Sequence, residues 1–243
     1  MRKILFFLLL AIMTAPSSAA NVLFIGDSHS VGPFGWKMDE LIRRMPGVSV
    51  GSYASCGSVF NWWETGRATT CGYFFRDMKG STSKGTKGAT PIFDKLLKEV
   101  KPQVVVVELG ANYAGWTSDE AAIKDMRNLV NRISSAKAKC FWISKPDARK
   151  GKENIPRILR LTRTAVEPYC TFFDSTLVTE YPAEGGDGVH YWNEKGRPIA
   201  EKWADEAFLV LRPLIEGIGS IGLKAEKDGD TVDGSMKDSA ERN

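Results

Sequence analysis

Five short runs of strand-forming residues recur along the chain, and they constrain the fold more than any other feature. They span residues 22–25, 48–53, 104–109, 140–144 and 171–174. Continuous rather than alternating apolar residues are typical of strands that are buried on both faces of a parallel sheet. Helical patterns separate most of these runs, over residues 91–100, 117–136, 155–166 and 193–211. This alternation predicts a doubly wound, flavodoxin-like α/β fold, in which a five-stranded parallel sheet lies between two layers of helices.

Two of these helices have recognisable ends. Thr117 and Glu120 have the spacing of a capping box at the start of the second helix. Pro213 follows the last helix and is expected to stop it, because proline removes a helical hydrogen bond.

The first twenty residues have the pattern of a secretory signal peptide. Arg2 and Lys3 precede an apolar stretch over residues 4–13, and small residues lead to a cut after Ala20. The apolar stretch is too short to span a bilayer, so no stable membrane anchor is expected. We predict an exported protein, periplasmic or secreted, with one domain over residues 21–216. The tail, residues 217–243, is rich in Gly, Asp and Lys and is predicted to be disordered.

Composition excludes several classes of protein. The chain is 43% hydrophobic and 26% charged, which fits a folded domain rather than a disordered chain. A net charge of +4 over 243 residues argues against a dedicated nucleic-acid binder. The chain has two histidines and no Cys-x-x-Cys pair, so neither a metal nor an organic cofactor is expected.

Export predicts that the four cysteines form two disulfides. Cys140 and Cys170 begin the fourth and fifth strands, and neighbouring parallel strands bring such residues within disulfide distance. Cys56 and Cys71 remain as the second pair. Cys56 directly precedes Gly57, so their bond would tie the long insertion to the backbone next to Gly57.

The insertion, residues 56–88, is too long for an ordinary connection and is predicted to be functional. Trp62 and Trp63 within it, together with Tyr113, are candidates for substrate binding, and packing of a lid is the alternative for the insertion's aromatic residues. The insertion ends in a basic stretch, residues 79–88, and a second basic loop spans residues 145–152. Both fit solvated surface, although an anionic substrate becomes plausible if both border the site.

The residues for chemistry follow the strands. Ser28 comes directly after the first strand, where sites of parallel sheets lie, and a serine nucleophile needs a base. His29 is adjacent to Ser28 and therefore diverges from it, which indicates a pocket wall or a solvent-facing residue. His190 is the remaining base, and Asp187 is placed to orient it. Ser30 is expected to cap a helix.

These residues resemble the four sequence blocks of the SGNH hydrolases, or GDSL-like esterases. The blocks match Gly26-Asp27-Ser28, Gly57, Gly110-Ala111-Asn112 and Asp187-x-x-His190. His29 and Tyr113 stand where the family usually has an apolar residue and Asp, which indicates a divergent member. The resemblance implies a catalytic Ser28, His190 and Asp187. It also implies an oxyanion hole formed by the backbone of Ser28 and Gly57 and by the side chain of Asn112.

These observations predict an exported serine esterase that removes a small, acetyl-type acyl group from a glycan or another envelope or extracellular substrate. A lipid or lysophospholipid esterase is one alternative, and a non-catalytic glycan-binding protein on the same scaffold is another. Glu108 interrupts a buried strand, which indicates a structural partner or a second acid. A glycosidase that uses Glu108 with Asp187 is therefore a further alternative. The acyl group, its acceptor and the oligomeric state stay open.

Overall fold

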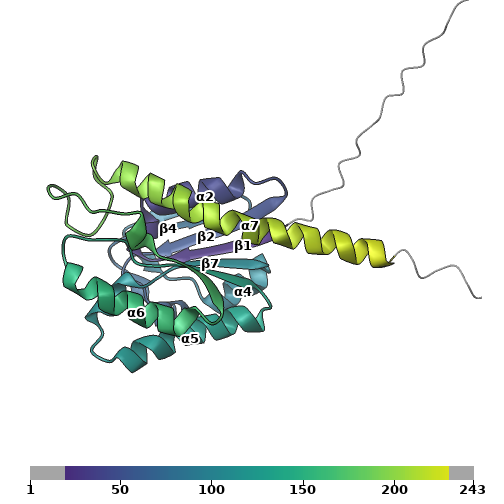
Figure 1. Cartoon of the computed structure of the whole chain (residues 1–243), viewed down its shortest axis with the longest axis horizontal. Coiled ribbons are helices and arrows are strands. Elements are labelled where there is room, and N and C mark those ends of the chain that lie inside the picture. The colour runs from purple at the N-terminus through teal and green to yellow at the C-terminus, as the bar shows by residue number, and fades with distance from the viewer. Residues whose placement is uncertain (1–19, 230–243) are drawn as a thin grey trace, which may run out of the picture.

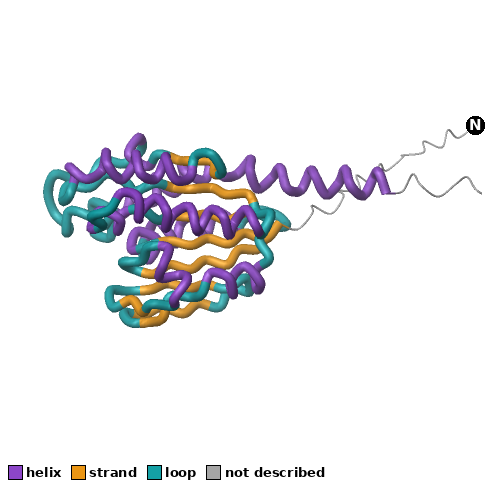
Figure 2. Tube along the Cα trace, turned by 90° about the horizontal axis from the view of Figure 1, so that it is seen from below, coloured by secondary structure: helices purple, strands orange, loops and turns teal. Residues whose placement is uncertain are grey.

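A mixed sheet of seven strands forms the centre of the molecule, in the order β5-β4-β2-β1-β7-β8-β9 (Figures 1 and 2). The computed structural model describes residues 20–229. The parallel strands are β1 (Ala20–Gly26), β2 (Val48–Ser55), β7 (Val104–Glu108), β8 (Lys139–Ile143) and β9 (Cys170–Phe173). All five predicted strands are thereby confirmed, and they are mutually parallel as predicted.

The prediction of five strands was wrong in number, because the insertion adds two more. Strand β4 (Tyr73–Arg76) pairs antiparallel with β2, and β5 (Thr82–Gly85) pairs antiparallel with β4. The added hairpin covers the backbone edge of β2, which would otherwise be open for pairing. A second, two-stranded sheet joins β3 (Ala68–Thr69) and β6 (Gly88–Ala89), so the end of the insertion is paired with its middle.

Helices cover both faces of the sheet and give three layers (Figure 1). The α-helices are α1 (Ser28–Val31), α2 (Pro33–Arg43), α3 (Phe60–Thr65), α4 (Phe93–Val100), α5 (Asp119–Ser135), α6 (Ile155–Val166) and α7 (Arg197–Gly229). The two layers are α2 with α7 on one face and α4, α5 and α6 on the other. Short 3₁₀ helices span Ala111–Gly115, Lys152–Asn154 and Ser175–Leu177. Apart from the helix that Ser30 was expected to cap, the sequence patterns did not predict α1, α2 or α3.

The central strands are buried on both faces, which explains their continuous apolar sequence. Val22 and Phe24 of β1 pack under α2 and α7, whereas Leu23 and Ile25 pack toward α4 and α5. All four side chains are buried. Burying apolar surface on both sides makes this strand the axis of the core and holds its carboxyl end in place.

Two predicted helix ends differ from the structure. Helix α5 begins at Asp119, and Ser118 rather than Thr117 caps it, with the Ser118 hydroxyl accepting from the Ala121 N–H at 3.1 Å. Helix α7 begins at Arg197 and continues through Pro213 to Gly229, so the expected stop before Pro213 was wrong. Leu211 and Ile215 are buried on either side of the proline, and this packing holds the helix together across the lost hydrogen bond.

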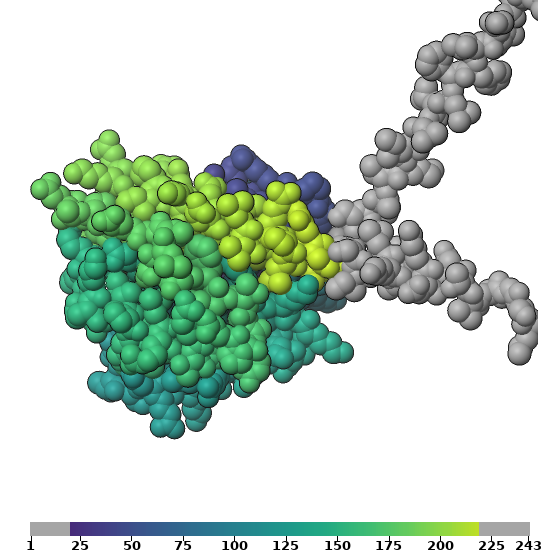
Figure 3. Space-filling view, viewed as in Figure 1, coloured from purple at the N-terminus to yellow at the C-terminus, as the bar shows by residue number. Residues whose placement is uncertain are grey.

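Helix α7 lies along the surface beside α2 (Figures 1 and 3). The ribbon of α7 extends past the sheet (Figure 1). Residues 217–229 of the predicted disordered tail are therefore helical, and residues 230–243 lie outside the described part of the chain. The predicted signal peptide also lies outside it, apart from Ala20, the buried first residue of β1. No helix in residues 20–229 is long and apolar enough to cross a membrane.

Both predicted disulfides are confirmed. Cys140 and Cys170 face each other in the β8–β9 register, with their Cα atoms 4.5 Å apart. This bond lies at the start of the two strands. Cys56 and Cys71 have Cα atoms 5.6 Å apart and join the turn after β2 to the insertion. The second bond therefore lies at the carboxyl end of the sheet, next to the predicted site.

Candidate active site

Three side chains from distant parts of the sequence form one hydrogen-bonded line. Ser28 Oγ lies 2.9 Å from His190 Nε2, and His190 Nδ1 lies 2.5 Å from Asp187 Oδ2. Ser28 is the first residue of α1, directly after β1, while Asp187 and His190 share the loop before α7. The structure thus brings together the three residues that were predicted to be catalytic. This geometry suits proton transfer from the serine hydroxyl to the imidazole.

Asp187 is held as an ionised acceptor. Its Oδ1 accepts the backbone N–H groups of Val189 at 2.8 Å and His190 at 2.7 Å. Partial burial alone would raise the pKa of Asp187, but the hydrogen bond from the His190 side chain and these backbone bonds lower it to about 2. An ionised Asp187 accepts the Nδ1 proton of a neutral imidazole, which leaves the Nε2 lone pair directed at Ser28.

Two free backbone donors lie beside the nucleophile. Gly57 follows β2 in a left-handed conformation with φ of +82°, which favours glycine. No hydrogen bond found in the described part of the chain uses the N–H of Ser28 or of Gly57. Both belong to the turns that follow the adjacent parallel strands β1 and β2. These two N–H groups are therefore available to a negatively charged oxygen.

The third predicted donor is already engaged. The Asn112 Nδ2 group donates to Asp27 Oδ2 at 3.2 Å and to the Ser58 carbonyl at 3.0 Å. These bonds link the residues that flank Ser28 and Gly57, so Asn112 ties the turns together. An oxyanion would have to replace one of the two acceptors, and the donor role of Asn112 stays a prediction.

A pair of buried carboxyls lies beneath the nucleophile. Asp27 caps α1 by accepting the His29 N–H at 3.1 Å, and Glu108 accepts the Ser30 hydroxyl at 2.8 Å. Both carboxyls are fully buried. Burial raises the pKa of Asp27 to about 6 and, together with the charge of Asp27, raises that of Glu108 well above its usual value. The Ser30 side chain is thus a hydrogen-bond donor to Glu108. Asp27 caps α1 and Gly32 precedes α2, so the expectation that Ser30 caps a helix was wrong.

The pKa of Asp27 predicts how stability changes with pH. Asp27 has a pKa of about 6 in the folded state and about 3.9 when unfolded, so between these values the folded state binds more protons. The contribution of Asp27 to the free energy of unfolding therefore falls as the pH rises from 4 to 7. Asp27→Asn removes this titration, and its stability relative to the wild type should rise over that range by roughly 3 kcal/mol or less.

Urea denaturation at pH 4.5, 6.0 and 7.5 measures this difference. Asp205→Asn, which removes a half-exposed carboxylate on α7, is the matched control and should show no such trend. A stability difference for Asp27→Asn that stays constant with pH would contradict the prediction.

His29 is a buried neighbour of the base. Its ring centre lies 5.5 Å from that of His190 and 5.9 Å from that of Trp203, and its side chain is almost inaccessible. Burial, followed by the charges of His190 and Lys145, lowers the pKa of His29 well below its usual value. A neutral His29 thus forms an inner wall behind His190, and the solvent-facing alternative is excluded.

Two of the three predicted substrate-binding residues lie in the core. Trp63 is fully buried and donates to the Ser58 hydroxyl at 3.2 Å. Tyr113 is also fully buried, and its hydroxyl donates to Asp125 at 2.7 Å. Their assignment to substrate binding was wrong, because both pack between the sheet and α5. Trp62 alone lies near the site, since a Cβ atom on Gly57 would be 3.4 Å from its ring.

The loop that carries Asp187 and His190 has supports that the sequence did not reveal. The Tyr181 hydroxyl donates to the His190 carbonyl at 3.1 Å and accepts the Gly188 N–H at 3.1 Å. Arg149 donates to the carbonyls of Pro182, Ala183 and Gly185. The carbonyls that Arg149 binds lie more than thirty residues from it along the chain. No local sequence pattern therefore signals these contacts.

The basic loop over residues 145–152 is therefore largely structural. Lys145 is buried and donates to the Pro146 carbonyl, and Lys152 pairs with Asp147 at 3.6 Å. With Arg149 bound to backbone carbonyls, these cations give no support to the expectation of an anionic substrate.

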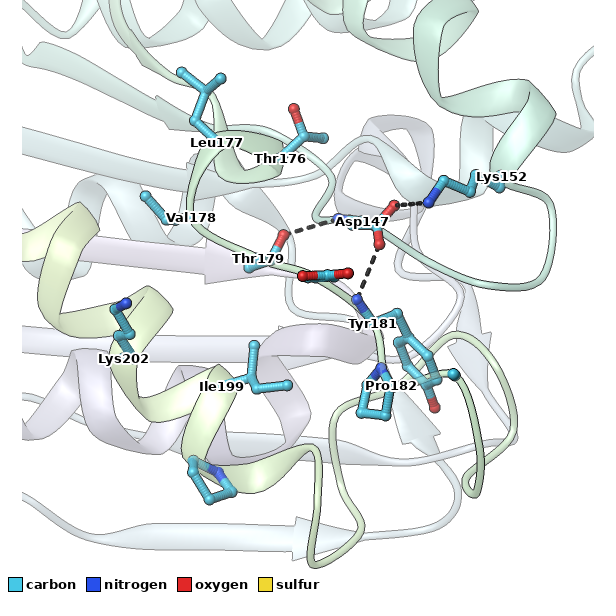
Figure 4. A pocket seen from close by; sticks show the side chains of 13 residues that line it. Asp147, Lys152, Thr176, Leu177, Val178, Thr179, Tyr181, Pro182, Ile199 and Lys202 are labelled. Carbon is cyan, nitrogen blue, oxygen red and sulfur yellow. Dashed lines mark hydrogen bonds and ion pairs between the residues drawn. The ribbon is translucent and has the colours of Figure 1, made fainter.

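An open cavity of about 1030 Å³ lies behind this loop (Figure 4). Asp147, Thr179 and Tyr181 line it, and Ser28, His190 and Asp187 do not. Tyr181 connects this cavity to the candidate site, because it lines the cavity and its hydroxyl donates to the His190 carbonyl. The three predicted catalytic residues thus lie outside this cavity.

Comparisons with known proteins give structural matches. No family model and no curated protein sequence matches the chain. The crystal structure of TesA aligns with a TM-score of 0.53 and 16% identity, over 77% of this chain and 97% of that one. The psychrotrophic esterase EstA from Pseudoalteromonas sp. aligns with a TM-score of 0.51 and 14% identity, over 79% and 99% of the two chains. A mutant of Axe2, an acetyl-xylooligosaccharide esterase from Geobacillus, aligns with a TM-score of 0.50 and 18% identity, over 81% and 94%. The chain shares the fold of these proteins.

Proposed function

We propose that this chain, whose fold is that of the SGNH hydrolases, is an exported serine esterase that removes a small acyl group from a glycan. One observation carries the proposal. Ser28 Oγ lies 2.9 Å from His190 Nε2, and the opposite ring nitrogen lies 2.5 Å from the carboxylate of Asp187. A binding protein has no need of a serine, a base and an orienting carboxylate in one line.

The reaction proceeds in two balanced steps. Ser28 Oγ attacks the ester carbonyl while His190 Nε2 takes its proton, and the N–H groups of Ser28 and Gly57 stabilise the oxyanion. The imidazolium returns the proton to the leaving alcohol, and an acyl-Ser28 ester remains. Water then attacks this ester with His190 as base, which releases the carboxylic acid and restores the hydroxyl of Ser28.

The preference for a small acyl group rests on the wall beside Gly57. A Cβ atom there would be in ordinary contact with the Trp62 ring, at 3.4 Å, and with Cys71 Sγ, at 3.7 Å, so these two groups border the turn that carries an oxyanion donor. A short acyl group such as acetyl meets this border without having to extend past it. An acetyl-xylooligosaccharide esterase shares this fold, which makes an acetylated glycan a reasonable substrate class.

Export rests on the leader-like sequence and on the two disulfides, which persist in oxidising compartments. A glycosidase that uses Glu108 is not supported, because Glu108 is fully buried and bonded to Ser30. It has no access to a glycosidic bond.

A substrate panel tests the proposal. We expect the highest kcat/KM for acetyl esters among p-nitrophenyl esters from acetate to palmitate, and release of acetate from acetylated oligosaccharides. A preference for long acyl chains would instead support a lipid esterase. A lack of turnover and of Ser28 labelling by a fluorophosphonate, with retained glycan binding, would support a non-catalytic binder.

The disulfide beside Gly57 should affect turnover as well as stability. A Cys56→Ser, Cys71→Ser variant opens a loop of 15 residues, which costs on the order of 3 kcal/mol in the chain-entropy treatment. Cys56 directly precedes Gly57, so we also expect kcat for acetyl esters to fall by roughly tenfold or more as an oxyanion donor becomes less well placed.

Cys140→Ser, Cys170→Ser is the matched control. It opens a loop of 30 residues and should cost at least as much stability, but the bond lies at the opposite end of the strands from Ser28. Kinetics below both melting temperatures separate the two effects. Equal losses of kcat in the two double variants would show that the Cys56–Cys71 bond has no specific role in the site.

A further inference from the structure

Trp192 lies flat against the catalytic base. Its ring centre is 4.3 Å from that of His190, and the two ring planes differ by 20°. Despite this stacking, 43% of Trp192 is exposed. Large aromatic side chains contribute most to stability when they are buried. Core packing therefore does not explain an indole that stacks on the proposed catalytic histidine and stays open to solvent.

A glycine makes room for the edge of this indole. Gly32 forms the turn between α1 and α2, four residues after Ser28. A Cβ atom on Gly32 would lie 2.2 Å from Trp192 Nε1, a distance that no side chain accepts. Trp192 is therefore seated between the imidazole of His190 and the backbone that follows the nucleophile. The absence of a side chain at Gly32 and the stacking on His190 together define the position of Trp192.

The chemistry of ester cleavage decides which part of a substrate meets Trp192. The acyl oxygen must face the donors at Ser28 and Gly57, and Trp62 lies on that side. The leaving oxygen must face His190, because this residue returns the proton to it. The alcohol portion of the ester thus lies on the side where Trp192 stacks on His190.

We propose that Trp192 forms a subsite for the sugar ring of the alcohol portion, an inference that rests on the proposed esterase function. The C–H groups on one face of a pyranose ring form an apolar surface that packs on the open indole, while its hydroxyls stay in water. Trp192 is therefore a specificity residue that favours a glycan ester over an ester of a small alcohol.

The test compares two substrates that share an acetyl group. One is acetylated xylotriose, and the other is ethyl acetate, whose alcohol is too small to stack. The readout is the ratio of their kcat/KM values, because any effect of Trp192 through His190 is common to both. Trp192→Ala should lower the ratio for xylotriose over ethyl acetate by about three- to tenfold. Trp192→Phe should retain most of it.

Trp36 provides the matched control. It is 44% exposed, lies near Phe74, and has no ring contact with His190 among those found. Trp36→Ala should leave the ratio unchanged. A Trp192→Ala variant that loses activity equally on both substrates would overturn the subsite, and it would leave Trp192 with a role in positioning His190 alone.

A binding measurement separates this inference from the proposed function. Ser28→Ala protein is titrated with unmodified xylotriose and with chitotriose, and tryptophan fluorescence is followed. We expect binding of at least one sugar to weaken by about three- to tenfold when Trp192→Ala is added. If the wild-type protein hydrolyses no ester and this binding still depends on Trp192, the proposed enzyme is refuted and the subsite is kept. No sugar binding, or binding unaffected by Trp192→Ala, would overturn the subsite.

Discussion

Ser28→Ala is expected to lower kcat for acetyl ester hydrolysis by about 10⁴- to 10⁶-fold. The hydroxyl lies 2.9 Å from His190 Nε2, and no covalent intermediate forms without it. Residual activity would come from the backbone donors alone, which a methyl side chain leaves in place. The variant should fold, because Ser28 is small and alanine fits the first turn of α1.

Initial rates and fluorophosphonate labelling, followed by peptide mapping, check this result. Ser134→Ala on the exposed side of α5 is the control and should keep full activity and full labelling. Labelling at a serine other than Ser28, or turnover retained in Ser28→Ala, would show that the nucleophile is misassigned.

Asp187→Asn should lower kcat by about 10⁴-fold without unfolding the loop. An asparagine keeps an oxygen that accepts the backbone N–H groups of Val189 and His190, as Asp187 Oδ1 does. Its amide nitrogen then faces His190 Nδ1 and forces the proton onto Nε2. The imidazole would present an N–H to Ser28 Oγ and could not take its proton.

Asp205→Asn is the matched control, since the Asp187 and Asp205 side chains are 52% and 50% exposed. Kinetics of both variants, with thermal unfolding to confirm the fold, make the comparison. If Asp187→Asn keeps more than about a tenth of the activity, His190 does not depend on this carboxylate for its tautomer.

The sequence motifs pointed to the three side chains that the structure brings together, Ser28, His190 and Asp187. Ser28 follows a strand whose apolar pattern is plain, and a parallel sheet brings the carboxyl ends of its strands to one edge. A related argument placed Cys140 opposite Cys170, because both residues begin strands that were expected to be parallel neighbours. Neither inference needs knowledge of contacts across the core.

Aromatic residues were less predictable. Trp62 and Trp63 are adjacent in the sequence, yet Trp62 lies by Gly57 while Trp63 is fully buried. Successive residues of a helix point in different directions, and α3 was not predicted. The only sequence signal for Trp192 is that it lies two residues after His190. Its stacking on His190 depends on the space that Gly32 leaves.

The sequence by itself determined the five parallel strands and both disulfides. It also singled out Ser28, His190 and Asp187, which the structure brings together. Continuous apolar runs and short motifs encode these features locally. The tertiary structure alone decided that the polar strand β5 extends the sheet, that Arg149 and Tyr181 bind carbonyls of the loop that carries Asp187 and His190, and that Asn112 donates to the Ser58 carbonyl. These depend on backbone groups, whose hydrogen-bonding capacity is the same for nearly every residue type, and so the sequence does not distinguish them.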